Sequence, residues 1–200
     1  MKLLLSSRNQ KKIKELRVLL EDMVENLEIV SLDDVGFASE IEETGATFEE
    51  NSLIKAREAM QSCGIATVAD DSGLVVDALG GMPGVMSARY AGEGRSEDAC
   101  IDKLLLNLQG VPDYERTARF VCVITCCFPD GRVITSRGEC EGVIARERRG
   151  SGRFGYDPVF YYPQYDMTFA QMDICIKNKI SHRAVAMEAF KRNFIDAINN

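Results

Sequence analysis

The sequence predicts an α/β protein built on one mixed β-sheet. Short apolar or β-branched segments, which are typical of buried strands, alternate with segments whose apolar residues recur at helical spacing. A Pro-Asp-Gly turn at residues 129–131 lies between two strand-like segments and predicts an antiparallel hairpin. No internal repeat, low-complexity segment or linker interrupts the 200 residues. A single domain over residues 1–200 is therefore expected.

The first half of the chain is expected to contain two strands, each followed by a helix. Thr47, with Glu50 three residues later, forms a capping box and predicts the start of the second helix. We assign Glu50 no role beyond this capping. Gly64 predicts its end. The expected segments are a strand at 3–6, a helix from 10 to about 21, a strand at 27–31 and a helix at 48–63.

The second half predicts more strands, because turn-forming residues separate short apolar runs there. A further helix is expected to start near Ser96, and Ser181 is the expected cap of the final helix. The cysteines at 122 and 126 should share one strand face, with Cys127 on the other. The expected segments are strands at 65–68, 74–78, 119–128, 132–138, 143–144 and 159–162, a helix from about 96 to before 110, and a final helix after 181.

Composition limits the classes of function. The apolar content of 46% and charged content of 28% are typical of a soluble globular protein, and no apolar run approaches a membrane span. The net charge of -7 argues against a nucleic-acid partner. Seven cysteines without CxxC spacing predict core thiols and a reducing cytoplasm. With His182 as the only histidine, a metal would be held by carboxylates and water, which suits Mg²⁺.

The segment 69–74, Ala-Asp-Asp-Ser-Gly-Leu, is the strongest candidate site. Asp70 and Asp71 follow an apolar strand, and buried carboxylates are costly unless a cation, water or hydrogen-bond donors meet them. Ser72 and Gly73 are expected to form a turn there. Open α/β sheets bind ligands at such strand ends. A solvated acidic turn is the competing interpretation.

A second candidate is the turn between the first strand and the first helix. Lys11 and Lys12 lie in the first turn of that helix, where free backbone N–H groups can bind phosphate. An ordinary exposed lysine pair is the competing interpretation. The chain has no GxxxxGK[ST] loop, so this is not the common nucleotide-binding loop.

Acids, lysines and an aromatic loop recur at the ends of the expected elements. Acids with lysines in a net-acidic protein suggest Mg²⁺ and a polyphosphate, and Phe154 offers a flat surface for a base. A Ser72–His182–Asp triad is conceivable, but the GxSxG elbow is missing. The residues concerned are the acids Glu43, Asp70 and Asp71, the lysines Lys12, Lys55 and Lys177, and the loops 154–157 and 181–183.

These motifs resemble those of the inosine triphosphate pyrophosphatase family over nearly the whole chain, in the same order and at the same spacing. In the phosphate motif the family more often has Thr-Gly where this chain has Ser7 and Arg8, so Arg8 adds bulk and charge there. The matching segments are 7–12, 43–51, 55–56, 69–74, 80–84, 87–90, 154–158, and Lys177 with 181–183.

The resemblance also implies roles for individual residues. Lys12 would be the key cation of the phosphate site, Glu43 and Asp71 would bind Mg²⁺, and Asp71 would also be the catalytic base. The phosphate site would comprise Ser7, Arg8, Asn9, Gln10, Lys11 and Lys12. The other substrate-binding residues would be Lys55, Ser72, Phe154, Gly155, Tyr156, Asp157, Lys177, His182 and Arg183.

The resemblance implies a two-lobed fold around a long mixed sheet, with the active site in the cleft, and a homodimer. The expected activity is Mg²⁺-dependent hydrolysis of non-standard purine nucleoside triphosphates (ITP, dITP and XTP) to the monophosphate and pyrophosphate. Two alternatives remain: a nucleotide-binding sensor without hydrolysis, and a related pyrophosphatase for other modified nucleotides.

Overall fold

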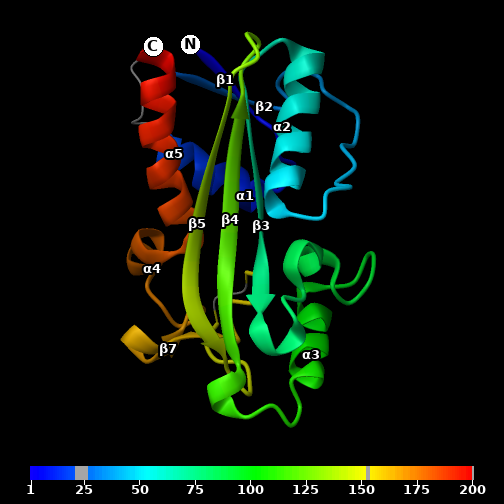
Figure 1. Cartoon of the computed structure of the whole chain (residues 1–200), viewed down its shortest axis with the longest axis vertical. Helices are drawn as coiled ribbons and strands as arrows, with labels where there is room; N and C mark the ends of the chain where they lie inside the picture. The colour runs from blue at the N-terminus through cyan, green and yellow to red at the C-terminus, as the bar shows by residue number, and fades with distance from the viewer. Residues whose placement is uncertain (21–26, 152–153, 200) are drawn as a thin grey trace. The chain divides into compact units, whose positions relative to one another are not determined.

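A computed structural model describes residues 1–20, 27–151 and 154–199. Its strands form one seven-stranded sheet in the order β2-β1-β3-β4-β5-β6-β7 (Figure 1). Strand β1 is parallel to β2 and β3, whereas β6 is antiparallel to β5 and β7. The predicted α/β class with a mixed sheet is confirmed. The strands are β1 (Lys2–Leu5), β2 (Glu28–Ser31), β3 (Thr67–Val76), β4 (Thr117–Cys127), β5 (Val133–Ile144), β6 (Phe160–Tyr162) and β7 (Met167–Thr168).

The chain divides into two compact units. Unit 1 contains the described residues of Met1–Asp71, Cys122–Gly138 and Ala186–Asn200, and unit 2 contains those of Ser72–Val121 and Glu139–Val185. Strands β3, β4 and β5 each contribute residues to both units. The α-helices are α1 (Gln10–Leu20), α2 (Phe48–Cys63), α3 (Glu97–Asn107), α4 (Ile174–Ile180) and α5 (His182–Asn199).

In unit 1, successive strand residues point to opposite sides, and helices cover both of these faces. Leu3 and Leu5 of β1 pack in the cluster that contains residues of α1 and α5. Leu4 packs instead with Ala59 of helix α2. Figure 1 labels this helix. The alternation therefore gives β1 two buried faces and explains its uninterrupted run of leucines.

The cysteines follow the same alternation. Cys122 and Cys126 of β4 belong to the core on the side of α1 and α5, and Cys127 packs against Ala56 of α2, as predicted. All seven cysteines are free thiols, and burial raises the pKa of Cys126 and, to about 12, that of Cys140. These buried thiols are apolar packing groups.

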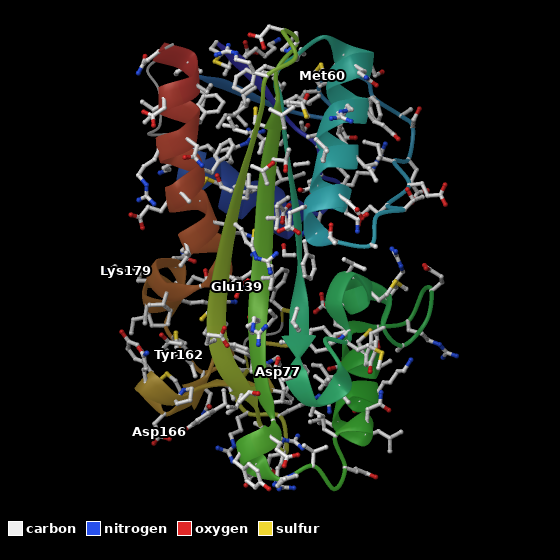
Figure 2. All side chains as sticks on the ribbon, viewed as in Figure 1. Met60, Asp77, Glu139, Tyr162, Asp166 and Lys179 are labelled. Atoms are coloured by element: carbon white, nitrogen blue, oxygen red, sulfur yellow. The ribbon has the colours of Figure 1, made fainter. Side chains whose placement is uncertain are left out.

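Unit 2 has an aromatic core. The ring centroids of Phe120 and Phe160 are 4.4 Å apart, and those of Phe160 and Phe169 are 4.9 Å apart. Asp77, labelled in Figure 2, follows β3 and accepts hydrogen bonds from the Thr117 hydroxyl and the Arg119 guanidinium of β4. These contacts fasten the end of β3 to the start of β4.

The predicted helix boundaries are confirmed where a cap defines them. The Thr47–Glu50 capping box begins α2, and Gly64 ends it at φ +66°. The Ser96 side chain caps α3, and the Ser181 hydroxyl accepts from Ala184 N at 3.3 Å at the start of α5.

The expected turn at Ser72–Gly73 is wrong. Strand β3 runs without interruption from Thr67 to Val76, through both aspartates. The strand can continue because the buried carboxylates of Asp70 and Asp71 meet lysine side chains, so they do not need a solvated turn. The short elements β7 and α4 were also not predicted, since neither is long enough to show a hydrophobic period.

None of the helices within the described ranges combines the length and apolar character that crossing a membrane would require.

Candidate active site

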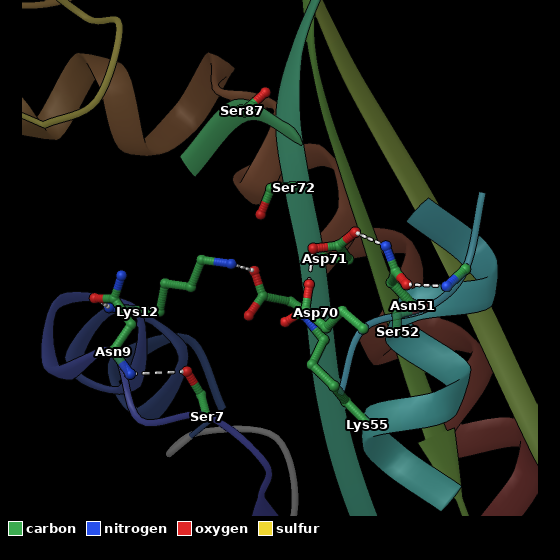
Figure 3. Close-up of polar contacts among 12 residues, drawn as sticks. Ser7, Asn9, Lys12, Asn51, Ser52, Lys55, Asp70, Asp71, Ser72 and Ser87 are labelled. Atoms are coloured by element: carbon green, nitrogen blue, oxygen red, sulfur yellow. Dashed lines mark hydrogen bonds and ion pairs between the residues drawn. The ribbon is translucent and has the colours of Figure 1, made fainter. Parts of the chain in front are cut away.

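Helix α1 begins at a turn that carries several of the predicted phosphate-binding residues. The Asn9 side-chain oxygen accepts from Lys12 N at 3.3 Å and so caps the first turn of the helix. Asn9 N in turn donates to the Ser7 hydroxyl at 3.3 Å (Figure 3). Gln10 and Lys11 occupy the same helical turn, but their side chains lie outside the described part of the structure.

Arg8 contacts the segment that precedes Glu43. Its Nη2 atom lies within 3.1 Å of the carbonyl oxygens of Phe37, Ala38 and Ser39. The side chain thereby ties the phosphate-motif turn to the loop that leads into the acidic segment.

The two aspartates of β3 point to opposite faces of the strand and meet different lysines. Lys12 Nζ of α1 lies 2.9 Å from Asp70 Oδ2, and Lys55 Nζ of α2 lies 3.3 Å from Asp71 Oδ1. The side chain of Asp70 is 1% exposed. Asp70 therefore serves as the buried counter-ion of Lys12, while Asp71 belongs to the α2 side.

Lys55 also brings the two predicted metal ligands together. Its Nζ atom lies 3.0 Å from Glu43 Oε1 as well as 3.3 Å from Asp71 Oδ1. Burial lowers the pKa of Lys55, but the charges of Asp71, Asp70 and Glu43 outweigh this effect, so its pKa lies above the ordinary value.

Burial has the opposite consequence for Asp71. It raises the pKa of Asp71 above the usual range, against the stabilising charges of Lys55 and Lys12, and the nearby Glu43 raises it further. An acid whose pKa is raised in this way accepts a proton more readily than an exposed aspartate. A proton acceptor at Asp71 fits this environment.

The donor set fits a hard divalent cation. Two carboxylates converge on one ammonium group, and carboxylate oxygens are the ligands that Mg²⁺ prefers. Among the residues that the structure describes, no group of three or more His, Cys, Asp or Glu side chains could by itself hold a metal ion. A metal at Glu43 and Asp71 would therefore need further oxygen ligands from water or substrate phosphates.

Unit 2 brings together most of the residues predicted to contact the base. The Lys177 ammonium forms an ion pair with Asp157 and lies 5.5 Å from the ring centroid of Phe154. The Arg183 guanidinium lies 5.7 Å from the same ring, and its Nη2 atom donates to the Ser72 hydroxyl at 3.4 Å. One aromatic ring and two cations thus form a compact group.

The neighbouring predicted residues have structural contacts in unit 2. The His182 ring stacks on Phe120 with centroids 4.8 Å apart. The Tyr156 hydroxyl donates to Ser87 O at 2.8 Å, and Gly155 N donates to Glu97 Oε2 at 3.0 Å. Ser72 lies within a strand and not on a strand-to-helix elbow, which argues against the serine triad.

Two polar residues that contact predicted site residues, one in each unit, had no role in the sequence-based prediction. Asn51 donates to Asp71 and lies four residues before Lys55, so helical spacing on one face of α2 could have identified it. Glu97, which holds the backbone of Gly155, gave no comparable signal because the two residues are far apart in the chain.

The Lys12–Asp70 pair leads to a first prediction. Lys12→Met should lower the free energy of unfolding by about 3 kcal/mol, because it leaves a buried carboxylate without its cation. Urea denaturation measures the loss, and Lys12→Met combined with Asp70→Asn should recover most of it. An unchanged stability in Lys12→Met would show that the pair contributes little.

Comparison with known proteins gives a consistent result. The dITP/XTP pyrophosphatase of Desulforamulus reducens is 50% identical over 188 residues, covering 94% of this chain and 92% of the relative. That of Bacillus subtilis is 44% identical over 189 residues, covering 94% of each chain.

Solved structures agree in fold. The Ham1 protein of Staphylococcus aureus superimposes with a TM-score of 0.90 at 38% identity, covering 98% of this chain and all (100%) of the other. A HAM1 protein from Coxiella burnetii gives a TM-score of 0.90 at 40% identity, with 98% and 99% coverage. The Ham1 family model itself matches residues 3–193. By sequence and by fold, the chain belongs to the Ham1 family.

Proposed function

We propose that this protein hydrolyses non-standard purine nucleoside triphosphates, namely dITP, ITP and XTP, to the nucleoside monophosphate and pyrophosphate. The names of its relatives support this substrate class. The observation that carries the proposal is the buried carboxylate of Asp71, held beside Lys55 and within the same unit as the Lys12–Asp70 pair. Such a hydrolase would remove deaminated purines from the nucleotide pool.

In the proposed reaction, Asp71 takes a proton from the water that attacks the α-phosphorus. The raised pKa of Asp71 supports this role, because a base whose pKa is nearer neutrality transfers protons more effectively. The oxygen of this water forms a bond to the α-phosphorus as the bond to the bridging oxygen breaks. Pyrophosphate leaves with the bridging oxygen, the water oxygen stays in the monophosphate, and no covalent enzyme intermediate is formed.

The charge of the cluster supports a divalent cation. Glu43, Asp70 and Asp71 carry three negative charges against the two positive charges of Lys12 and Lys55. This net negative group would repel a triphosphate unless a cation accompanied the substrate. We propose that this cation is Mg²⁺, held by Glu43 and Asp71. When bound, Mg²⁺ supplies a Lewis acid that offsets charge on the triphosphate oxygens.

The phosphates would be bound by the turn at the start of α1. Lys12 and Lys55 would act as point charges toward phosphate oxygens, and Ser7, Asn9 and the backbone N–H groups of the first helical turn would donate hydrogen bonds. We assign Gln10 and Lys11 to the same site by their positions in the motif. For Arg8 we propose an indirect contribution, because its guanidinium contacts three carbonyl oxygens of the 37–39 segment.

The purine would be bound by the group in unit 2. Phe154 offers an apolar ring for stacking, and Arg183 and Lys177 supply hydrogen-bond donors. The remaining contacts that we propose come from Ser72, Gly155, Tyr156, Asp157 and His182.

Product analysis in ¹⁸O-labelled water tests the reaction. We expect pyrophosphate and monophosphate in equal amounts, with the label only in the monophosphate, because attack at the α-phosphorus puts the water oxygen there. Orthophosphate as the first product, or label in pyrophosphate, would exclude this mechanism. A panel of ITP, dITP, XTP, GTP, ATP and a pyrimidine triphosphate tests the substrate class in the same assay.

We further propose a homodimer in the cytoplasm. The dimer follows from the sequence resemblance, and the free thiols support a reducing compartment. Sedimentation of the purified protein tests the oligomeric state.

A further inference from the structure

We propose that Asn51 is a positioning residue, which fixes the orientation of the Asp71 carboxylate and, through Gly45, the segment that carries Glu43. This inference rests on the proposed function, in which Asp71 is the base. Asn51 lies in the first turns of α2 and is 0% exposed, so its polar side chain is fully removed from solvent. A buried amide is costly unless both of its ends are paired.

Both ends of the Asn51 amide have partners that fix its orientation. Its Nδ2 atom lies 3.3 Å from Asp71 Oδ2, and its Oδ1 atom accepts from Gly45 N at 2.8 Å (Figure 3). An ionised carboxylate only accepts hydrogen bonds and a backbone N–H only donates them. The amide therefore has one satisfactory orientation, with its NH₂ group toward Asp71.

The contact with Gly45 leaves no room for a side chain. A Cβ atom at Gly45 would lie 2.7 Å from Asn51 Oδ1 and 2.6 Å from Glu50 Cβ. Glu43 is two residues before Gly45, and its carboxylate contacts the same Lys55 as Asp71 does. Asn51 therefore joins the strand that carries one predicted metal ligand to the segment that carries the other.

The carboxylate of Asp71 is held at both oxygens. Lys55 contacts Oδ1 and Asn51 contacts Oδ2, and the two donors lie four residues apart on one face of α2. Two donors on different oxygens oppose rotation of the carboxylate about its bond to Cβ. Loss of the Asn51 donor would leave Asp71 charged but free to turn, which slows the reaction more than it weakens substrate binding.

Asn51→Asp separates these contacts with almost no change in size. The new carboxylate can still accept from Gly45 N but presents an oxygen, instead of a donor, to Asp71. We expect kcat for dITP to fall about 100-fold while KM changes less than about threefold. Ser52→Ala is the matched control, because Ser52 is the next residue, is equally buried, and hydrogen-bonds Thr125 instead of the acids. It should retain kcat within about twofold.

Thermal stability tests the contact without reference to activity. Asn51→Asp should lower the melting temperature by roughly 5 °C, because it places two buried carboxylates together. Adding Asp71→Asn should restore most of this loss, since the amide and the carboxylate then exchange places. The double variant lacks the base in either case, so its activity is not informative. A merely structural role for Asn51 would instead leave kcat of the folded Asn51→Asp protein near the wild-type value, or would lower kcat equally in Ser52→Ala.

The outcomes separate this inference from the proposed function. If the wild-type protein does not release pyrophosphate from dITP, the proposed function fails, and the stability cycle alone decides whether the contact exists. If the wild-type protein is active and Asn51→Asp keeps its kcat, the positioning role is overturned. Should Asn51→Asp fail to fold, the smaller and uncharged Asn51→Ser replaces it, with the same fall in kcat at unchanged KM expected and an unchanged kcat contradicting the proposal.

Discussion

Asp71→Asn should reduce kcat by at least about 1,000-fold, because it removes both the proposed proton acceptor and a negative charge for Mg²⁺. The substitution preserves the size of the side chain. The amide can still receive a hydrogen bond from Asn51 on its oxygen, so the local packing should survive. Pyrophosphate release from dITP at saturating Mg²⁺ measures the effect.

The stability of the same variant should not fall. Burial raises the pKa of Asp71, so at neutral pH the ionised carboxylate costs the folded state free energy, and this cost appears as the pH rises above the pKa of the unfolded chain. A neutral amide removes that cost. Asp130→Asn, in the exposed β4–β5 turn, is the matched control and should keep full activity. Turnover near the wild-type rate in Asp71→Asn would disprove the assignment of Asp71 as base.

Arg183→Ala should lower kcat/KM for ITP about 100-fold while changing the low rate on ATP less than about threefold. Arg183 is buried beside Phe154 and Ser72, and its guanidinium has only hydrogen-bond donors. Hypoxanthine and xanthine carry an oxygen at position 6, which accepts from such a donor. Adenine carries an amino group there, which leaves the donor without a partner.

The control for this variant lies on the same helix. Arg192→Ala removes an exposed arginine of α5 that pairs with Glu188, and it should affect neither substrate. Equal losses on ITP and ATP in Arg183→Ala would instead identify Arg183 as a phosphate or structural contact. Steady-state kinetics on the two nucleotides distinguishes these outcomes.

Local patterns predicted the parts of the fold that depend on local interactions. The capping box of Thr47 and Glu50, the Gly64 terminus and the two cysteine faces of β4 all follow from helix caps and strand alternation. Strand β3 was predicted wrongly at Ser72–Gly73 because local turn propensity ignores distant partners. Lys12 and Lys55 lie on separate helices, and only the folded chain brings them to Asp70 and Asp71.

The candidate site shows the same limit. The acids and lysines could be identified from the sequence and its family resemblance, but not the way in which they pair. Lys55 contacts both Glu43 and Asp71, whereas Lys12 contacts Asp70, and no spacing rule separates these choices. Three expectations stay predictions: that the active site lies in a cleft, that it binds a metal, and that the individual residues have the roles proposed for them.

The alternation of Asp70 and Asp71 across β3 has a consequence for how this segment can evolve. Substitutions elsewhere in the strand leave each acid on its own face, but loss of one residue just before Asp70 would exchange the faces of every residue that follows. Asp71 would then point toward Lys12, and the base would be removed from Lys55 and Asn51. Insertions and deletions should therefore be much rarer in β3 before the acids than in the loop at residues 91–95, where a change of length moves neither a strand face nor a proposed site residue.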